Sequence, residues 1–208
     1  MAYQSVWYFT DLPEEIIEIL DKDVSRYDES MTTSQIAGDT IRKEKRDSKN
    51  AWIPTTHWVA GFIWHYVMKA NRENFLYDLT RMDGEAIQYT KYEEGQFYAW
   101  HQDGGLEQYH KPETVISYEK HKDESIRNFL NKNTEYVRKL SFVLQLSDPD
   151  DYEGGNLELV DESGLNYIAP RRRGTMILFD SRTKHRVNPV TKGCRRSLVG
   201  WTVGPRWK

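Results

Sequence analysis

Three predicted strands follow one another in the stretch Thr175-Met-Ile-Leu-Phe-Asp-Ser-Arg-Thr-Lys-His185-Arg-Val-Asn-Pro-Val-Thr-Lys-Gly-Cys-Arg195-Arg-Ser-Leu-Val-Gly-Trp-Thr-Val203. Apolar and β-branched residues gather at 175–179, 185–190 and 197–203, and Lys192-Gly193 provides a turn before the last run. Comparable runs occur at 86–92, 140–146 and 156–160, and the first of them alternates in polarity as a half-buried strand does. Many short strands separated by turns predict a mainly β fold, either a sandwich or a barrel.

Two helices are predicted before these strands. Apolar residues recur at helical spacing over 12–23, where we expect Asp11 to cap the helix and Pro13 to lie in its first turn. A second apolar stripe predicts a helix from a cap at Thr56 to about Leu79. The polar residues from about Ser25 to Asn50 predict strand plus loop. We therefore expect a single domain over 1–208, with a helical support layer at 1–83 and a β core at 84–208.

The composition limits the class of protein. The chain has 208 residues, with 29 Lys+Arg and 32 Asp+Glu, so the formal net charge is −3. This near-balance argues against a strongly basic nucleic-acid-binding protein and against attraction to an anionic membrane surface. No signal peptide or membrane span is recognisable, which predicts a soluble, cytoplasmic protein. With the single cysteine, Cys194, no intrachain disulfide forms, and no CxxC pair is available for zinc.

The triplet His101-Gln-Asp103 suggests part of a metal site. On a strand, residues i and i+2 point to the same side, so the imidazole and the carboxylate would project together. An H-x-D triplet alone is a weak signal, and a third ligand must come from elsewhere in the chain. His185, on a later predicted strand, would complete a set of two histidines and one carboxylate. That set leaves positions open on non-haem Fe(II).

The residues after His185 add a cation to this picture. If the turn at Lys192-Gly193 folds the chain back, Arg195 on the next strand approaches the same cavity as His185. A guanidinium there would bind a carboxylate through two hydrogen bonds. A metal with open positions and a deeper arginine together suit a five-carbon keto-diacid. Its keto-acid end would chelate the metal, and its distal carboxylate would pair with Arg195.

Three ordered blocks resemble the iron(II)- and 2-oxoglutarate-dependent oxygenases, specifically the prolyl-4-hydroxylase-like branch with its bacterial and phage-type hydroxylases. The first, Tyr92-Glu-Glu-Gly-Gln-Phe-Tyr98-Ala-Trp-His101-Gln-Asp103, is similar to the family pattern Y-x-x-G-x-x-Y-x-x-H-x-D. The second, 140–157, contains a strand, an acidic loop and a double glycine; the third comprises 174–181, His185 and 189–195. The resemblance runs from Tyr89 to Trp201 and implies a double-stranded β-helix, a jelly-roll-like barrel with the iron near its open end.

The resemblance also implies roles for single residues. By family analogy His101, Asp103 and His185 bind Fe(II), and Arg195 pairs with the distal carboxylate of 2-oxoglutarate. Tyr92 is similar to the tyrosine that often hydrogen-bonds this cosubstrate, and Tyr98 competes for that role. Either tyrosine could equally be a core aromatic. The cofactors implied are Fe(II), 2-oxoglutarate and O2, with ascorbate as a further candidate.

Other chemically distinctive residues have plainer interpretations. His57 and His65 are expected to be packing or surface residues, Arg196 a solvated neighbour on the opposite strand face, and Trp201 a packing residue. Arg171-Arg-Arg173 is expected to be a solvated turn, and Gly154-Gly155 a turn or a close backbone approach. The Cys194 thiol is expected to be buried, inert and turned away from Arg195. The polar segment from Gly104 to Tyr136 is either a solvated excursion or a loop beside the active-site mouth.

The preferred function is an Fe(II)- and 2-oxoglutarate-dependent dioxygenase that hydroxylates an unactivated C–H bond, with a prolyl residue in a peptide or protein as the leading substrate. A free amino acid or another small molecule is the alternative. A nucleic-acid demethylase of the same superfamily typically has a second arginine six positions after the cosubstrate arginine, where this chain has Trp201. A non-catalytic cupin-like barrel would leave the coexistence of His101, Asp103, His185 and Arg195 to accident.

Overall fold

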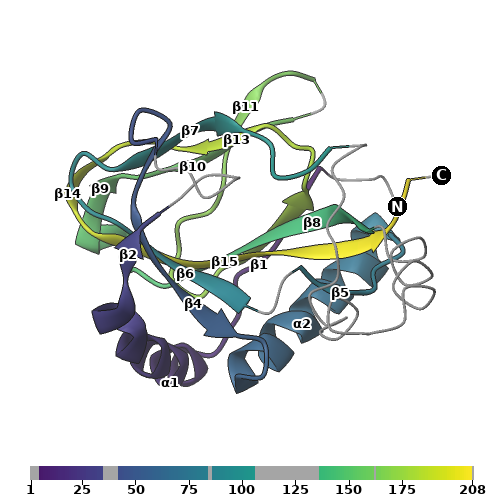
Figure 1. The fold of residues 1–208 in the computed structure, drawn as a ribbon, viewed down its shortest axis with the longest axis horizontal. Coiled ribbons are helices and arrows are strands. Elements are labelled where there is room, and N and C mark those ends of the chain that lie inside the picture. Colours follow the sequence, from purple (N-terminus) through teal and green to yellow (C-terminus); the bar gives the residue numbers. More distant parts are fainter. Residues whose placement is uncertain (1–4, 35–41, 84–85, 106–135, 162, 208) are drawn as a thin grey trace, which may run out of the picture.

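The fold has three layers, which Figure 1 shows from the side: two helices, a large antiparallel sheet, and a smaller sheet on the other face of the large one. The computed structural model describes residues 5–34, 42–83, 86–105, 136–161 and 163–207. The helices are α1 (Glu14–Val24) and α2 (Trp58–Ala70), with short helical turns η1 (Ser25–Ser30), η2 (Asn71–Phe75) and η3 (Pro149–Asp151).

The large sheet has the strand order β1-β12-β8-β15-β6-β4-β2, with β5 also paired to β15, and every pairing is antiparallel. Its strands are β1 (Val6–Phe9), β2 (Thr32–Thr33), β4 (Lys49–Pro54), β5 (Arg81–Met82), β6 (Ala86–Tyr92), β8 (Tyr136–Gln145), β12 (Met176–Asp180) and β15 (Arg195–Pro205). The long central strands β8 and β15 pair over most of their length, and they form the middle of the large sheet, between the helices and the smaller sheet.

The smaller sheet has the order β11-β10-β13-β7-β3, and a separate two-stranded sheet pairs β14 with β9. The strands are β3 (Arg46–Asp47), β7 (Phe97–His101), β9 (Tyr152–Gly154), β10 (Leu157–Val160), β11 (Asn166–Ile168), β13 (His185–Val187) and β14 (Val190–Gly193). The mainly β, jelly-roll-like fold predicted from the sequence is thus confirmed. In the described part of the chain, however, strand pairing does not close the sheets into a barrel.

Alternation along the large sheet builds two cores. On β12, Met176 and Leu178 pack in the cluster beneath the helices, whereas Ile177 and Phe179 pack in the cluster between the sheets. On β8, Leu144 faces the helices and Val143 the smaller sheet. Both faces of a central strand are therefore buried, which explains why the runs at 140–146 and 175–179 are nearly continuous in apolar residues.

The N-terminal part differs from the predicted helical layer because it also contributes strands. β1 pairs with β12, and β4 pairs with β6 along its whole length, so residues 6–9 and 49–54 extend the large sheet. The run Val6-Trp-Tyr-Phe9 is rich in residues that favour strands, and this signal was missed. The division of the chain into one domain with two parts stays a prediction.

Both predicted helices are present, but their ends differ from the prediction. Helix α1 begins at Glu14 with Pro13 as its N-cap residue, and Asp11 does not cap it, because a capping side chain must directly precede the first helical residue. Helix α2 is capped by His57, whose Nδ1 accepts from Val59 N at 3.4 Å, and not by Thr56. After the η2 turn the helix ends at Leu76, which has a left-handed conformation (φ 53°), and so does not reach Leu79.

The segment predicted as an insertion, 104–136, lies outside the described residues except at its two ends. At the first end, the main-chain N–H groups of Asp103 and Gly104 both donate to Ser181 O at 2.9 Å. At the other end, Tyr136 begins β8. Its role beside a site therefore stays a prediction. Within the described residues, every helix is too short or too polar to cross a membrane.

Candidate functional site

The strand pairing of the smaller sheet brings the two predicted histidine ligands together. His101 is the last residue of β7 and His185 the first of β13, and the two residues are direct partners in the antiparallel pairing of these strands. Their ring centroids lie 4.1 Å apart. One antiparallel strand pairing thus brings together two residues that are more than eighty positions apart in sequence.

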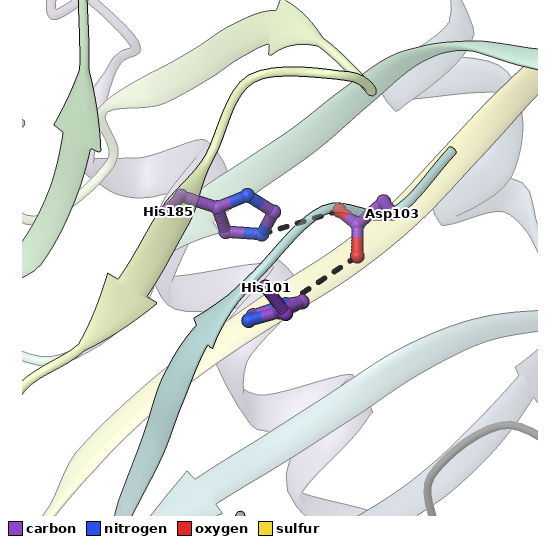
Figure 2. A group of neighbouring side chains, drawn as sticks. All are labelled: His101, Asp103 and His185. Carbon is purple, nitrogen blue, oxygen red and sulfur yellow. Dashed lines mark ion pairs between the residues drawn. The ribbon is translucent and has the colours of Figure 1, made fainter. Parts of the chain in front are cut away.

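Asp103 completes the group, but not as a strand residue. Strand β7 ends at His101, and Asp103 lies two residues beyond it. Figure 2 shows both imidazoles facing its carboxylate: His101 Nε2 is 3.5 Å from Oδ1, and His185 Nε2 is 3.3 Å from Oδ2. The three potential ligand atoms lie within 4.8 Å of one another. The predicted convergence of these residues is therefore present, although a turn and not the i, i+2 rule of a strand directs Asp103.

The hydrogen bonds of the two imidazoles fit a metal site. His101 Nδ1 lies 2.8 Å from Ala99 O, and His185 Nδ1 lies 2.9 Å from Thr183 O. A carbonyl only accepts, so the Nδ1 atom of each neutral ring carries the proton. The Nε2 atoms then face Asp103, and each can bind a metal when it carries no proton. Two imidazole nitrogens and one carboxylate are the donor set that suits non-haem Fe(II), and anchoring of the second nitrogen by a carbonyl is typical of metal-bound histidines.

The electrostatics also suit a cation. Burial opposes ionisation of Asp103, but the nearby imidazoles of His185 and His101 hold the pKa of its carboxyl well below the usual range. Burial lowers the pKa of His101, and attraction by Asp103 offsets this only in part. At His185 burial acts in the same direction, but the attraction of Asp103 dominates and raises its pKa. The carboxylate is therefore ionised at neutral pH and available as an anionic ligand.

One pocket between the two sheets contains all six residues singled out in the sequence. Its lining includes His101, Asp103, His185, Arg195, Tyr92 and Tyr98. Its walls are mainly apolar and a few polar groups converge in it, as is usual in sites for small molecules.

Arg195 is a buried cation in this pocket, with only 2% of its surface exposed. Its Nη2 donates to Gln145 Oε1 at 2.9 Å and its Nη1 to Ser197 Oγ at 3.4 Å, while its buried Nε has no partner among the described residues. Neutral partners leave the charge of a buried guanidinium unbalanced, which is costly unless an anion joins it. The turn that returns the chain to the cavity, predicted at Lys192-Gly193, is present: Gly193 has φ +75° and β15 starts at Arg195.

The two tyrosines occupy different parts of the pocket. Tyr92 is the direct cross-strand partner of Arg195, whose guanidinium lies 5.7 Å from its ring centroid. Tyr98 instead stacks on His101, with ring centroids 3.5 Å apart, and burial raises its pKa to about 12. Tyr92 therefore lies beside the arginine and Tyr98 beside the candidate metal ligand.

Two predictions about arginines are wrong. Arg196 faces away from the pocket as expected, but it is not a solvated neighbour: its guanidinium donates to Asp21 on α1 at 2.7 and 2.9 Å. The cluster 171–173 is not simply a solvated turn either. Arg171 donates to main-chain carbonyls of Pro149 and Tyr152, and Arg173 bonds to Leu146 O and to acidic residues of α1. Charged groups that look interchangeable in sequence acquire fixed partners only when the helix packs on the sheet.

Of the remaining interpretations, that of the two glycines is confirmed, and those of Cys194 and Trp201 need qualification. Gly154 and Gly155 have φ of +71° and +61°, and a Cβ at Gly154 would lie 2.3 Å from Pro189 O, so a close backbone approach is confirmed. The Cys194 thiol is half-buried, and burial raises its pKa, which lowers its reactivity. Trp201 is not only a packing residue, because it also lines the pocket, with the Arg138 guanidinium 4.0 Å from its ring centroid.

Several site residues were missed by sequence reasoning. Gln145 holds Arg195, Ser141 Oγ donates to Asp103 Oδ2 at 2.7 Å, and Arg46 lies 4.8 Å from the ring centroid of Tyr98. Ser141 and Gln145 interrupt the apolar run of β8 on the face toward the smaller sheet. Two polar residues, four apart in a buried strand, are a signal that could have been used.

Comparison with known proteins fits this geometry. The model of the 2OG-Fe(II) oxygenase superfamily matches residues 87–203, more than half of the chain and all of the segment from β6 to β15 that carries the six pocket residues. The chain belongs to the 2OG-Fe(II) oxygenase superfamily. This confirms the resemblance read from the sequence, and with it the cofactor class that the family implies: Fe(II), 2-oxoglutarate and O2.

Relatives with curated names are hydroxylases, matched over part of their length. A PKHD-type hydroxylase of Pseudomonas fluorescens is 38% identical over 86 residues, which is 41% of this chain and 38% of that protein. One of Picosynechococcus sp. is 39% identical over 87 residues, 41% of this chain and 36% of the relative. The chain thus matches well under half the length of these superfamily members.

Solved structures of oxygenases share the fold. A prolyl-4-hydroxylase of Pseudomonas putida aligns with a TM-score of 0.66 at 20% identity, over 96% of this chain and 92% of that one. A prolyl hydroxylase of Trichoplax adhaerens, in complex with a hypoxia-inducible-factor oxygen degradation domain peptide fragment, aligns with a TM-score of 0.71 at 16% identity, over 96% and 84%. These likenesses support the predicted double-stranded β-helix, and at such identities they concern the fold alone.

Proposed function

We propose that this superfamily member is an Fe(II)- and 2-oxoglutarate-dependent hydroxylase whose substrate is a prolyl residue in a peptide. The observation that carries the first part is the content of one pocket: two imidazoles and an ionised carboxylate together with a buried arginine whose Nε is unpaired. A carboxylate-binding group and a metal-binding group in one cavity suit a cosubstrate that needs both.

Each pocket residue then has a task. His101, Asp103 and His185 hold Fe(II) through Nε2 atoms and a carboxylate oxygen, and Arg195 binds the distal carboxylate of 2-oxoglutarate. Tyr92, the cross-strand partner of Arg195, is the better placed tyrosine to donate to the cosubstrate. When bound, Fe(II) with 2-oxoglutarate and O2 supplies the oxidising chemistry for C–H hydroxylation. The apolar walls keep bulk water from that chemistry.

The peptidyl-proline part rests on two supports. The relatives are named hydroxylases, and prolyl hydroxylases are among the solved structures with this fold, one of them in complex with a peptide. The pocket also presents the rings of Tyr98 and Trp201. An aromatic face suits the apolar, conformationally fixed proline ring.

The test combines cosubstrate turnover with product mass. Purified protein with Fe(II), 2-oxoglutarate and O2 is expected to convert 2-oxoglutarate to succinate and to add one oxygen atom to a proline-containing peptide, detected by mass spectrometry. His185→Ala should abolish metal binding and turnover, whereas His65→Ala, at an exposed position on α2, should leave both intact. Retained metal stoichiometry in His185→Ala would contradict the metal site. Turnover with modification of a free amino acid and of no peptide would contradict the peptidyl assignment and keep the oxygenase.

A further inference from the structure

Two buried serines lie in line behind the Asp103 carboxylate. Ser141 on β8 donates to Asp103 Oδ2 at 2.7 Å, and Ser181, just after β12, places its Oγ 3.1 Å from Ser141 Oγ. Ser141 is 1% exposed and Ser181 is fully buried. We call this pair the Ser141–Ser181 dyad.

The number of protons fixes the direction of these bonds. A serine hydroxyl has one proton to donate, and an ionised carboxylate can only accept. Ser141 therefore donates its hydroxyl proton to the hydrogen bond with Asp103, so Ser181 must be the donor between the two hydroxyls. The result is a chain, Ser181 to Ser141 to Asp103 Oδ2, in which each donation polarises and strengthens the next.

Ser181 also fixes the main chain of Asp103. Since β7 ends at His101, no strand pairing holds the backbone at position 103. Instead, the N–H groups of Asp103 and Gly104 donate to Ser181 O, and Ser181 N donates to Lys139 O at 3.0 Å. The carboxylate of Asp103 is thus held by Ser141 on β8, and its main chain by Ser181, whose own N–H donates to β8.

The two carboxylate oxygens are consequently unequal. Oδ2 receives the hydroxyl of Ser141 and lies 3.3 Å from His185 Nε2, whereas Oδ1 lies 3.5 Å from His101 Nε2 and has no hydroxyl donor recorded within the described residues. Carboxylates that bind a metal are usually hydrogen-bonded by neighbouring groups, which fix their orientation and raise the metal affinity.

We propose that the Ser141–Ser181 dyad fixes the orientation of the Asp103 carboxylate between the two imidazoles and thereby strengthens metal binding at this site. The two serines are positioning residues: they act through Asp103 and do not touch the substrate. This inference rests on the proposed function, because it assumes that His101, Asp103 and His185 hold the metal. It adds two residues that hold one of the proposed metal ligands in place.

The probe is Mn(II), whose binding is measured by calorimetry without 2-oxoglutarate and without turnover. Ser141→Ala should weaken Mn(II) binding by about 10- to 100-fold, the usual effect of removing a hydrogen-bond partner of a metal ligand. Ser181→Ala should weaken it less, because Ser141 can still donate to Asp103. Ser141→Thr keeps the hydroxyl on a strand position that favours β-branched residues and should bind within a few-fold of the unchanged protein.

The matched control is Ser34→Ala. Ser34 is also buried (1% exposed) and also belongs to a serine pair, since its Oγ accepts from Ser48 Oγ at 2.8 Å, but it does not line the pocket. The Ser34→Ala variant should lose about as much thermal stability as Ser141→Ala and keep its Mn(II) affinity. A merely structural role for Ser141 would give the same pattern for both variants.

The outcomes separate the two proposals. If the unchanged protein fails to bind Mn(II), the proposed metal site is wrong and the dyad has nothing to position. If the unchanged protein binds Mn(II) and folded Ser141→Ala binds it equally well, the proposed function stands and the dyad proposal is refuted. Weak binding by Ser141→Ala without recovery in Ser141→Thr would also count against it, because the hydroxyl would not be the group responsible.

Discussion

Replacing Arg195 by methionine should weaken 2-oxoglutarate binding and leave the fold intact. The buried stem of Arg195 packs in the pocket, and methionine fills a similar elongated volume without the charge. What is lost is the guanidinium, whose Nε and Nη atoms are the cationic donors at this end of the pocket. The variant should therefore fold and bind metal, yet bind 2-oxoglutarate poorly.

The size of the effect follows from the hydrogen bonds available. A charge-assisted bond to a carboxylate contributes about 1.5–3 kcal/mol, so losing one weakens binding by about 10- to 150-fold. At a ligand concentration of about 100 times the Kd, bound 2-oxoglutarate stabilises the folded protein by about 2.7 kcal/mol. A variant with about 100-fold weaker binding gains only about 0.4 kcal/mol at that same concentration. For a chain of this length each kcal/mol shifts Tm by about 2–4 °C.

Thermal denaturation with saturating Mn(II), with and without 2-oxoglutarate, measures this difference directly. We expect a shift of about 5–11 °C for the unchanged protein and about 1–2 °C for Arg195→Met. Arg196→Met is the control, because Arg196 pairs with Asp21 on the opposite face of β15. It should lower the starting Tm and leave the 2-oxoglutarate shift intact. An equal shift in Arg195→Met, or equal losses in both variants, would refute the assignment of Arg195.

Three further variants test the surroundings of the site and the cost of a side chain at positive φ. Burial opposes ionisation of Asp180, but hydrogen bonds from Arg182 and Tyr77 lower its pKa below the usual value. The Asp180 carboxylate thus stabilises the fold above about pH 4, and this stability is lost as the pH falls through the lower folded pKa. Asp180→Asn should cost about 1–3 kcal/mol in urea unfolding at pH 7 and less at acid pH; a pH-independent cost would contradict this. Gly164→Ala should cost about 1 kcal/mol because Gly164 has positive φ, and Gly155→Ala should cost more, because its Cβ would also lie 3.0 Å from Val190 Cγ2. Only Gly155→Ala should also weaken 2-oxoglutarate binding, since its Cβ would lie 3.3 Å from Arg195 Cδ; equal affinities would exclude this contact.

The sequence alone predicted the chemistry of the site because the informative residues lie in short, ordered blocks. His101 and Asp103 are two residues apart, and Arg195 follows His185 after one turn, so local spacing already restricts where these side chains can point. All of these residues then line one pocket. Buried strands were equally predictable, since β8 and β12 are covered on both faces and are apolar along most of their length.

The same local reasoning failed where two distant segments had to meet. The residues at 6–9 favour a strand, but only their pairing with β12 places that strand in the large sheet. The ends of both helices depended on single backbone conformations, such as the left-handed Leu76. Arg196 was read as solvated because its partner, Asp21, is 175 residues away in sequence.

Sequence thus determined the fold class, the family, and which residues could serve as ligands, because strand periodicity, turn chemistry and motif spacing are properties of neighbouring residues. Tertiary structure alone decided how these ligands are held. Ser141 and Ser181 carry no motif, yet pairing of β8 with β12 places their hydroxyls in line with the Asp103 carboxylate. A hydrogen bond depends on ångström distances between atoms, and only the packing of the two sheets sets those distances.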